Sequence, residues 1–184
     1  DNPERTESSF TTPSGNQIFE NESLGITFSA PAGWLLQEPE KTNENMPDVV
    51  AVGPKIGPVN PVVSLTIDDL NGKSFDDIIL EKNEFLKSSI ESGDLEIISQ
   101  ERIKINGKDS YVTNAQGTFR NNGQAFEVKF REVIIITPEK SYSFAYSNGF
   151  EHFDDQVSKF EESVNSFSLL SEKDEAILSN KEGG

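Results

Sequence analysis

Apolar and polar residues alternate over several short stretches of this chain, which is the pattern of β-strands with one buried face. Apolar side chains occupy every second position from Leu24 to Phe28 and again from Val63 to Ile67. A period of two predicts half-buried strands at both places. Pro31 and Gly33 end the first of these strands, and Trp34, the only tryptophan, opens the next element.

The rest of the pattern predicts a meander of strands. Asn-Gly pairs at 106–107 and 122–123 are strong hairpin signals. The strands predicted after the opening one are Trp34 to Glu38, Val49 to Val52, Val62 to Leu70, Leu95 to Ile105, Asp109 to Phe119, Phe126 to Thr137, Ser141 to Ser147 and Ser166 to Leu170. Strands joined by hairpins pair antiparallel, so the predicted fold class is α+β: a central antiparallel β-sheet of about six strands with helices packed on its faces.

Two stretches have the period of an α-helix. Ser74 can cap the first helix, Asp76 and Asp77 suit its first turn, and Ser92-Gly93 ends it. The apolar positions at helical spacing are Ile78, Phe85, Leu86 and Ile90 in the first helix, and Phe153, Val157, Phe160 and Val164 in the second.

The composition is that of an acidic protein with a lean apolar content. The net charge is −16 at pH 7, 34% of the residues are hydrophobic, and there is no cysteine. Disulfides and thiolate metal sites are therefore excluded, and nucleic acid would be repelled. No apolar run approaches the roughly 20 residues that span a bilayer. We expect a monomer without a transmembrane segment, whose partner is a cationic or membrane-associated protein.

Three segments are expected from the distribution of residue types. Residues 1–17 are rich in Ser, Thr, Pro and Asn and are predicted to be a flexible linker or stalk. Residues 18–170 form the folded domain, and residues 171–184 form a polar C-terminal tail. A stalk favours an extracytoplasmic protein, secreted or membrane-anchored through an N-terminal segment that has been removed. The alternative is an ordinary disordered tail.

The opening stretch resembles a known superfamily. Phe19, Asn21, Leu24, Gly25, Ile26, Phe28, Pro31 and Trp34 match the opening of the PsbP-like superfamily, F-x-N-x-x-x-G-I-x-F-x-x-P-x-x-W. The closing helix followed by Val164 to Phe167 resembles its ending, and the order of elements agrees across residues 18–170. The superfamily includes the extrinsic photosystem II protein PsbP, prokaryotic lipoprotein domains and a Ran-binding nuclear import factor.

This resemblance implies a βαβ sandwich and a secreted or membrane-tethered accessory role. It implies no catalytic residues. The chain lacks the flanking region through which plant PsbP engages the photosystem, so the resemblance favours a non-photosynthetic prokaryotic member.

Hydrolytic chemistry finds no support in the residues. A nucleophilic Ser or Thr needs a base, most often His, and the chain has one histidine and no G-x-S-x-G motif. His152, Asp154 and Asp155 form the one mixed cluster of metal-ligand types, at a predicted helix start. A divalent cation such as zinc would need a third ligand from elsewhere. The alternative is that the two aspartates compensate the helix dipole and His152 is solvated. No other cofactor is expected.

Three further groups could form sites. Asp68-Asp69, with Asp76-Asp77 beyond, resembles hard-cation sequence but lacks the spacing of a calcium loop. Glu127 and Glu132 flank Lys129 and Arg131 on the longest strand, where cross-strand pairing explains them better than acid–base catalysis. The aromatic residues that could line a groove, or form core, are Tyr111, Tyr142, Phe144, Tyr146 and Phe150. We expect any site between the sheet and the irregular segment 49–62.

These observations leave three hypotheses. The first is a non-enzymatic, extracytoplasmic accessory or binding domain that docks a protein partner through its acidic surface. The second is a divalent-metal-binding protein that uses His152, Asp154 and Asp155. The third is a factor of the same fold that binds a small GTPase.

Overall fold

Strands outnumber helices in the structure, a computed structural model that describes residues 10–11 and 15–173. The chain divides into two compact units: Asp1–Gly33 with Lys159–Gly184 (unit 1), and Trp34–Ser158 (unit 2). The domain predicted over residues 18–170 contains parts of both units, and its boundaries stay a prediction.

A small antiparallel sheet organises unit 1. Among its described residues the strand order is β1 (Phe10–Thr11), β2 (Gln17–Asn21), β3 (Ile26–Ala30) and β11 (Ser168–Leu169). Phe19 of β2 faces Phe28 of β3, with ring centroids 5.1 Å apart. The residues from Ile26 to Phe28 are all buried. The prediction of a half-buried strand here was therefore wrong, because the small, uncharged Thr27 is buried as readily as its apolar neighbours.

Both ends of the predicted domain continue into regular structure. β1 lies within the segment 1–17 that was predicted to be a linker, and it pairs with Gln17 and Ile18 of β2. Residues 170–173, at the start of the predicted tail, are helical, and Leu170 N–H donates to the Gly25 carbonyl at 2.9 Å. The remaining residues of both predicted segments, 1–9, 12–14 and 174–184, lie outside the described residues.

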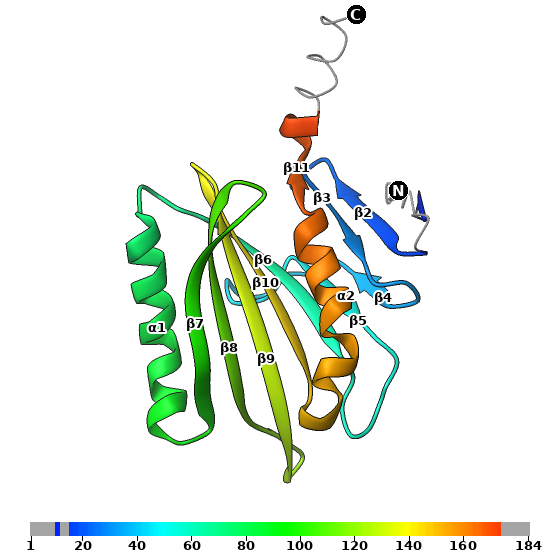
Figure 1. Ribbon diagram of the computed structural model, residues 1–184, viewed down its shortest axis with the longest axis vertical. Coiled ribbons are helices and arrows are strands. Elements are labelled where there is room, and N and C mark those ends of the chain that lie inside the picture. The colour runs from blue at the N-terminus through cyan, green and yellow to red at the C-terminus, as the bar shows by residue number, and fades with distance from the viewer. Residues whose placement is uncertain (1–9, 12–14, 174–184) are drawn as a thin grey trace, which may run out of the picture. The chain divides into compact units, whose positions relative to one another are not determined.

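A larger sheet forms most of unit 2 (Figure 1). In the part of unit 2 that the structure describes, it has seven strands, all paired antiparallel. Their order is β4 (Leu35–Gln37), β5 (Val49–Val52), β6 (Val62–Asp69), β10 (Lys140–Gly149), β9 (Gln124–Ile136), β8 (Lys108–Asn121) and β7 (Leu95–Ile105). The α+β class with a central antiparallel sheet is thus confirmed, with one strand more than expected.

The first helix, α1 (Phe75–Glu91), begins where the sequence predicts. Ser74 Oγ accepts from the Asp77 backbone N–H, and the Asp77 carboxylate accepts from the Ser74 N–H, which is a capping box. α1 packs on the sheet through Ile79, which lies in one cluster with Tyr111 of β8 and Ile134 of β9. The helix ends at Glu91 with Ser92 as its C-cap, so Ser92-Gly93 ends it as predicted.

The two faces of the sheet differ strongly in burial. On β10, Tyr142, Phe144 and Tyr146 share one face and are at most 3% exposed. On the opposite face of β10, Ser143, Ala145 and Ser147 are half-buried. β6 repeats the alternation, with Val63 and Leu65 buried. The core of unit 2 therefore follows one face of β6 and β10, and the other face is partly open to solvent.

Candidate functional site

The structure brings together part of the predicted metal cluster. His152 ends a short 3₁₀ helix, η1 (Phe150–His152), and both aspartates lie in the first turn of α2 (Phe153–Ser166). His152 Nδ1 is 3.2 Å from Asp155 Oδ2, and both Asp154 and Asp155 are exposed. Among residues 10–11 and 15–173, no group of three or more His, Asp or Glu side chains could hold a metal ion. The metal site therefore stays a prediction that needs a third ligand.

A buried hydrogen-bond network fixes the backbone that carries His152. Asn148, fully buried at the end of β10, donates to the His152 carbonyl at 2.9 Å and to the Tyr146 hydroxyl at 3.2 Å. The Tyr146 hydroxyl in turn donates to the Phe153 carbonyl at 2.9 Å. These bonds satisfy buried polar groups where β10 leads into η1. His152 is thus positioned by the fold, whether or not it binds a ligand.

The irregular segment between β5 and β6 is ordered by close packing. Gly53 N–H donates to the Pro61 carbonyl at 2.8 Å, and a Cβ at Gly53 would lie 2.7 Å from the Trp34 ring. Gly57 lies against the His152 ring, which would be 3.1 Å from an added Cβ. The segment therefore packs against Trp34 and against η1, and the site expected between this segment and the sheet stays a prediction.

The predicted aromatic groove is mostly core. Tyr111, Tyr142, Phe144 and Tyr146 are all buried, and Tyr111 lies on the opposite face of the sheet from the other three. Phe150 is 45% exposed, and its ring lies 4.5 Å from Lys129 Nζ. Aromatic residues on adjacent strands thus form core here, as their usual role suggests.

Glu127 and Glu132, the two glutamates of β9, lie on opposite faces of the sheet. Glu132 of β9 is opposite Thr113 and Ala145, on the face that α1 partly covers, whereas Glu127 is on the other face. They cannot act as a catalytic pair. Instead, Glu132 Oε2 accepts from Lys82 Nζ of α1 at 2.7 Å, and both side chains are about four-fifths buried (17% and 20% exposed). Sequence reasoning missed this ion pair, since no local signal links residues 50 positions apart.

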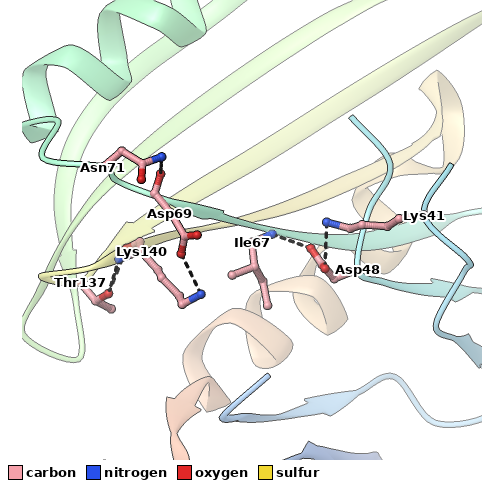
Figure 2. Close-up of polar contacts among 7 residues, drawn as sticks. All are labelled: Lys41, Asp48, Ile67, Asp69, Asn71, Thr137 and Lys140. Atoms are coloured by element: carbon pink, nitrogen blue, oxygen red, sulfur yellow. Dashed lines mark hydrogen bonds and ion pairs between the residues drawn. The ribbon is translucent and has the colours of Figure 1, made fainter. Parts of the chain in front are cut away.

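Carboxylates gather where β6 ends, α1 begins and the β9–β10 turn lies. We call this group the acidic edge; it consists of Asp48, Asp68, Asp69, Asp76, Asp77, Glu81 and Glu139. Asp69 pairs with Lys140 at 2.9 Å, and Asp48 accepts both from Lys41 at 2.9 Å and from the Ile67 N–H at 2.8 Å (Figure 2). Lys73 pairs with Glu81 and Arg102 with Asp76. The carboxylates outnumber these cations.

The local electrostatics follow from this crowding. Partial burial of the Asp68 carboxyl raises its pKa, and the charges of Asp48 and Asp69 raise it further, against the opposite effect of Lys41 and Lys73. The hydrogen bond to Asp69 raises the pKa of Lys140. An added cation near Asp68 would therefore be stabilised by carboxylates that the protein's own lysines do not fully neutralise.

None of the helices in the described residues has a stretch long and apolar enough to cross a membrane.

No protein-family model matches the chain, and no curated protein sequence matches it. Solved structures do match. The chain is similar to cyanobacterial PsbP (CyanoP) from Synechocystis, with a TM-score of 0.62 and 18% identity over 86% of this chain and 94% of that one.

Two further structures share this arrangement. LpqN of Mycobacterium tuberculosis, described as involved in cell envelope biogenesis, has a TM-score of 0.56 and 13% identity over 88% of this chain and 89% of that one. PA94 of Pseudomonas aeruginosa, of unknown function, has a TM-score of 0.55 and 11% identity over 82% and 94%. The fold is thus PsbP-like, as the resemblance of the opening residues implied. At these identities the likeness concerns the fold alone.

Proposed function

We propose that this protein is a non-enzymatic, extracytoplasmic accessory domain that docks a protein partner through the acidic edge. The excess of carboxylates at that edge carries the proposal. They lie on strand ends and a capped helix start, so the field they create is held in place by regular structure. The similarity to CyanoP and to LpqN supports an accessory role at a membrane or envelope.

A cationic protein surface is the partner that this edge favours. Docking would place partner Lys or Arg side chains near Asp68, where they would relieve the repulsion among its neighbours. Such pairs are exposed, so each contributes little affinity but steers association and is weakened by salt. A net charge of −16 extends the attraction over the approach of the partner.

Cross-linking to the native cell envelope tests this proposal, with the soluble cytoplasmic fraction run alongside. The variant Asp68→Asn/Asp69→Asn removes two charges from the edge, and Glu101→Gln/Glu127→Gln removes two exposed charges from elsewhere in unit 2. We expect envelope partners that are captured by the second variant but lost in the first variant. They should also be lost at about 0.5 M salt, where charges more than roughly 4 Å apart are screened. Recovery from the cytoplasm alone would contradict the extracytoplasmic role and favour the small-GTPase hypothesis instead.

One observation favours a second candidate, a divalent-cation site. His152 and Asp155 share a face, with His152 Nδ1 at hydrogen-bond distance from Asp155 Oδ2. A partner or a segment of another chain would supply the missing ligand. Zinc titration by calorimetry, compared with His152→Asn, Asp154→Asn and Asp155→Asn, distinguishes the two predicted aspartates: only loss of binding in all three variants supports all three residues as ligands.

A further inference from the structure

The turn between β2 and β3 carries the one N-glycosylation motif of the chain. Asn21-Glu22-Ser23 is the only Asn-x-Ser/Thr triplet in the sequence that has a residue other than proline in the middle. In a protein outside the cytoplasm, the amide of such an asparagine can accept a sugar. Triplets of this kind also occur by chance, so accessibility and geometry decide whether this one is a site.

Backbone hydrogen bonds hold the turn in one conformation. Gly25, at a φ of 68°, donates its N–H to the Glu22 carbonyl at 3.2 Å, and its own carbonyl accepts from the Leu170 N–H at 2.9 Å. Glu22 and Ser23 are exposed, and Asn21 is half-buried at the end of β2. The triplet therefore lies on an ordered surface turn that an enzyme can reach.

The two side chains that define the motif are in contact. Ser23 Oγ donates to Asn21 Oδ1 at 2.7 Å, and the same oxygen accepts from the Leu24 backbone N–H at 3.0 Å. A hydroxyl that donates to an amide oxygen draws electron density from the amide nitrogen, and the N–H becomes more acidic. The nitrogen that must lose a proton during sugar transfer is thus polarised by the residue that the motif requires.

Folding of the turn explains Asn21 but not Ser23. Asn21 matches the opening pattern F-x-N-x-x-x-G, and its bond to the Leu24 N–H is a reason for asparagine at that position. Ser23 occupies a position that the pattern leaves open, and within the described residues its hydroxyl bonds to Asn21 alone. Ser23 is therefore the residue at which a glycosylation site and a merely structural turn differ.

We propose that Asn21 is an N-glycosylation site, which takes its sugar from a lipid-linked diphosphate sugar. Asn21 Nδ2 forms a bond to the anomeric carbon of the sugar, and the bond from this carbon to the diphosphate oxygen breaks. The lipid diphosphate leaves, and one amide proton passes to a base of the transferase. The inference rests on the extracytoplasmic location in the proposed function, because such donors are used outside the cytoplasm. It needs neither the acidic edge nor a docked partner.

The test compares the full chain with two variants of one residue. All three proteins are expressed in the native host and recovered from its envelope and cytoplasmic fractions. Ser23→Ala removes the hydroxyl and keeps the Asn21 side chain, whereas Ser23→Thr keeps both. Trypsin cuts after Arg5 and Lys41, so a single peptide, residues 6–41, contains the motif. Mass spectrometry of this peptide, with fragmentation that preserves side-chain modifications, shows whether a sugar is present and on which residue.

We expect the envelope form of the unchanged chain to carry at least one sugar on Asn21. Ser23→Ala should lower the modified fraction at least about tenfold, and Ser23→Thr should keep it within about threefold, since the motif accepts either hydroxyl. Urea unfolding of the unchanged chain and Ser23→Ala, both made in a host without the transferase, is the folding control. Because Ser23 is exposed, the two midpoints should agree.

Three results would overturn the inference. An unmodified peptide from the envelope fraction would remove the site and leave docking through the acidic edge in place. Sugar that persists in Ser23→Ala, or that maps to a serine or threonine of the peptide, would place the modification elsewhere. Recovery from the cytoplasm alone would contradict the proposed function together with the inference, so the two failures are distinguishable.

Discussion

The buried hydroxyl of Tyr146 offers the sharpest test of the structure. Tyr146 is fully buried, and its hydroxyl both donates to the Phe153 carbonyl and accepts from the Asn148 side chain, at 2.9 and 3.2 Å. Tyr146→Phe removes the oxygen and keeps the ring. The substitution leaves one Asn148 N–H buried without an acceptor, while the other still reaches the His152 carbonyl.

The expected loss follows from that stranded donor. A buried polar group left unsatisfied costs about 1–3 kcal/mol, and little cavity is created, so we expect about 2 kcal/mol. With a urea m-value of roughly 2 kcal/mol/M, the unfolding midpoint falls by about 1 M. For a chain of 184 residues the same loss lowers the melting temperature by roughly 4–8 °C.

Urea unfolding, followed by Trp34 fluorescence and by far-ultraviolet circular dichroism, measures this loss. Tyr111→Phe is the matched control, since Tyr111 is nearly as buried but its hydroxyl has no hydrogen-bond partner among the described residues. We expect it to lose less than about 0.5 kcal/mol. Equal losses in the two variants, or no loss in Tyr146→Phe, would refute the argument that this network fixes the start of η1 and α2.

Three further predictions concern stability. Burial raises the pKa of Tyr146 to about 12, so above pH 10 the unfolded state loses a proton that the folded state keeps. The free energy of unfolding should therefore fall by up to about 3 kcal/mol between pH 10 and 12. Tyr146→Phe should lack this part of the fall. Gly53→Ala places a Cβ 2.7 Å from the Trp34 ring, which should cost about 1–3 kcal/mol in urea unfolding and shift the tryptophan emission to the red. Ser74→Ala removes the acceptor of the Asp77 backbone N–H, and thermal unfolding should show a loss of about 1 kcal/mol, whereas Ser74→Asp should retain most of the stability.

Local signals predicted most elements of the larger sheet. The Asn-Gly turns fall where β7 meets β8 and β8 meets β9, with Asn106 and Asn122 at positive φ. The start of α1 depends on residues three positions apart, which sequence displays directly. By contrast, β2 was missed, because Ile18 and Phe19 are adjacent and break the alternation. Pairing with β3, rather than any pattern of its own, makes this segment a strand.

Periodicity also misjudged which side chains are buried. Phe85 has the helical spacing of a core residue, yet it is 70% exposed, with Lys82 Nζ 5.7 Å from its ring centroid. Only Ile79 of α1 is fully buried, so the apolar contact of this helix is narrower than its sequence suggests. Glu132 lies on the same face of β9 as Phe130 and Ile134, so a charged residue interrupts an apolar pattern. The residue that pairs with it, Lys82 of α1, lies 50 positions earlier, where no local pattern indicates the contact.

The side chains that cover β7 differ in kind from those on the half-buried face of β10. Long charged side chains cover β7, where Glu101, Arg102 and Lys104 are exposed. Such residues keep a strand soluble and discourage another strand from pairing with it. The half-buried face of β10 carries Ser143, Ala145 and Ser147 instead, although 26% of the chain is charged. Solubility alone would favour lysine and glutamate at those positions. Ser143, Ala145 and Ser147 therefore leave this part of β10 without the cover of long charged side chains that β7 has.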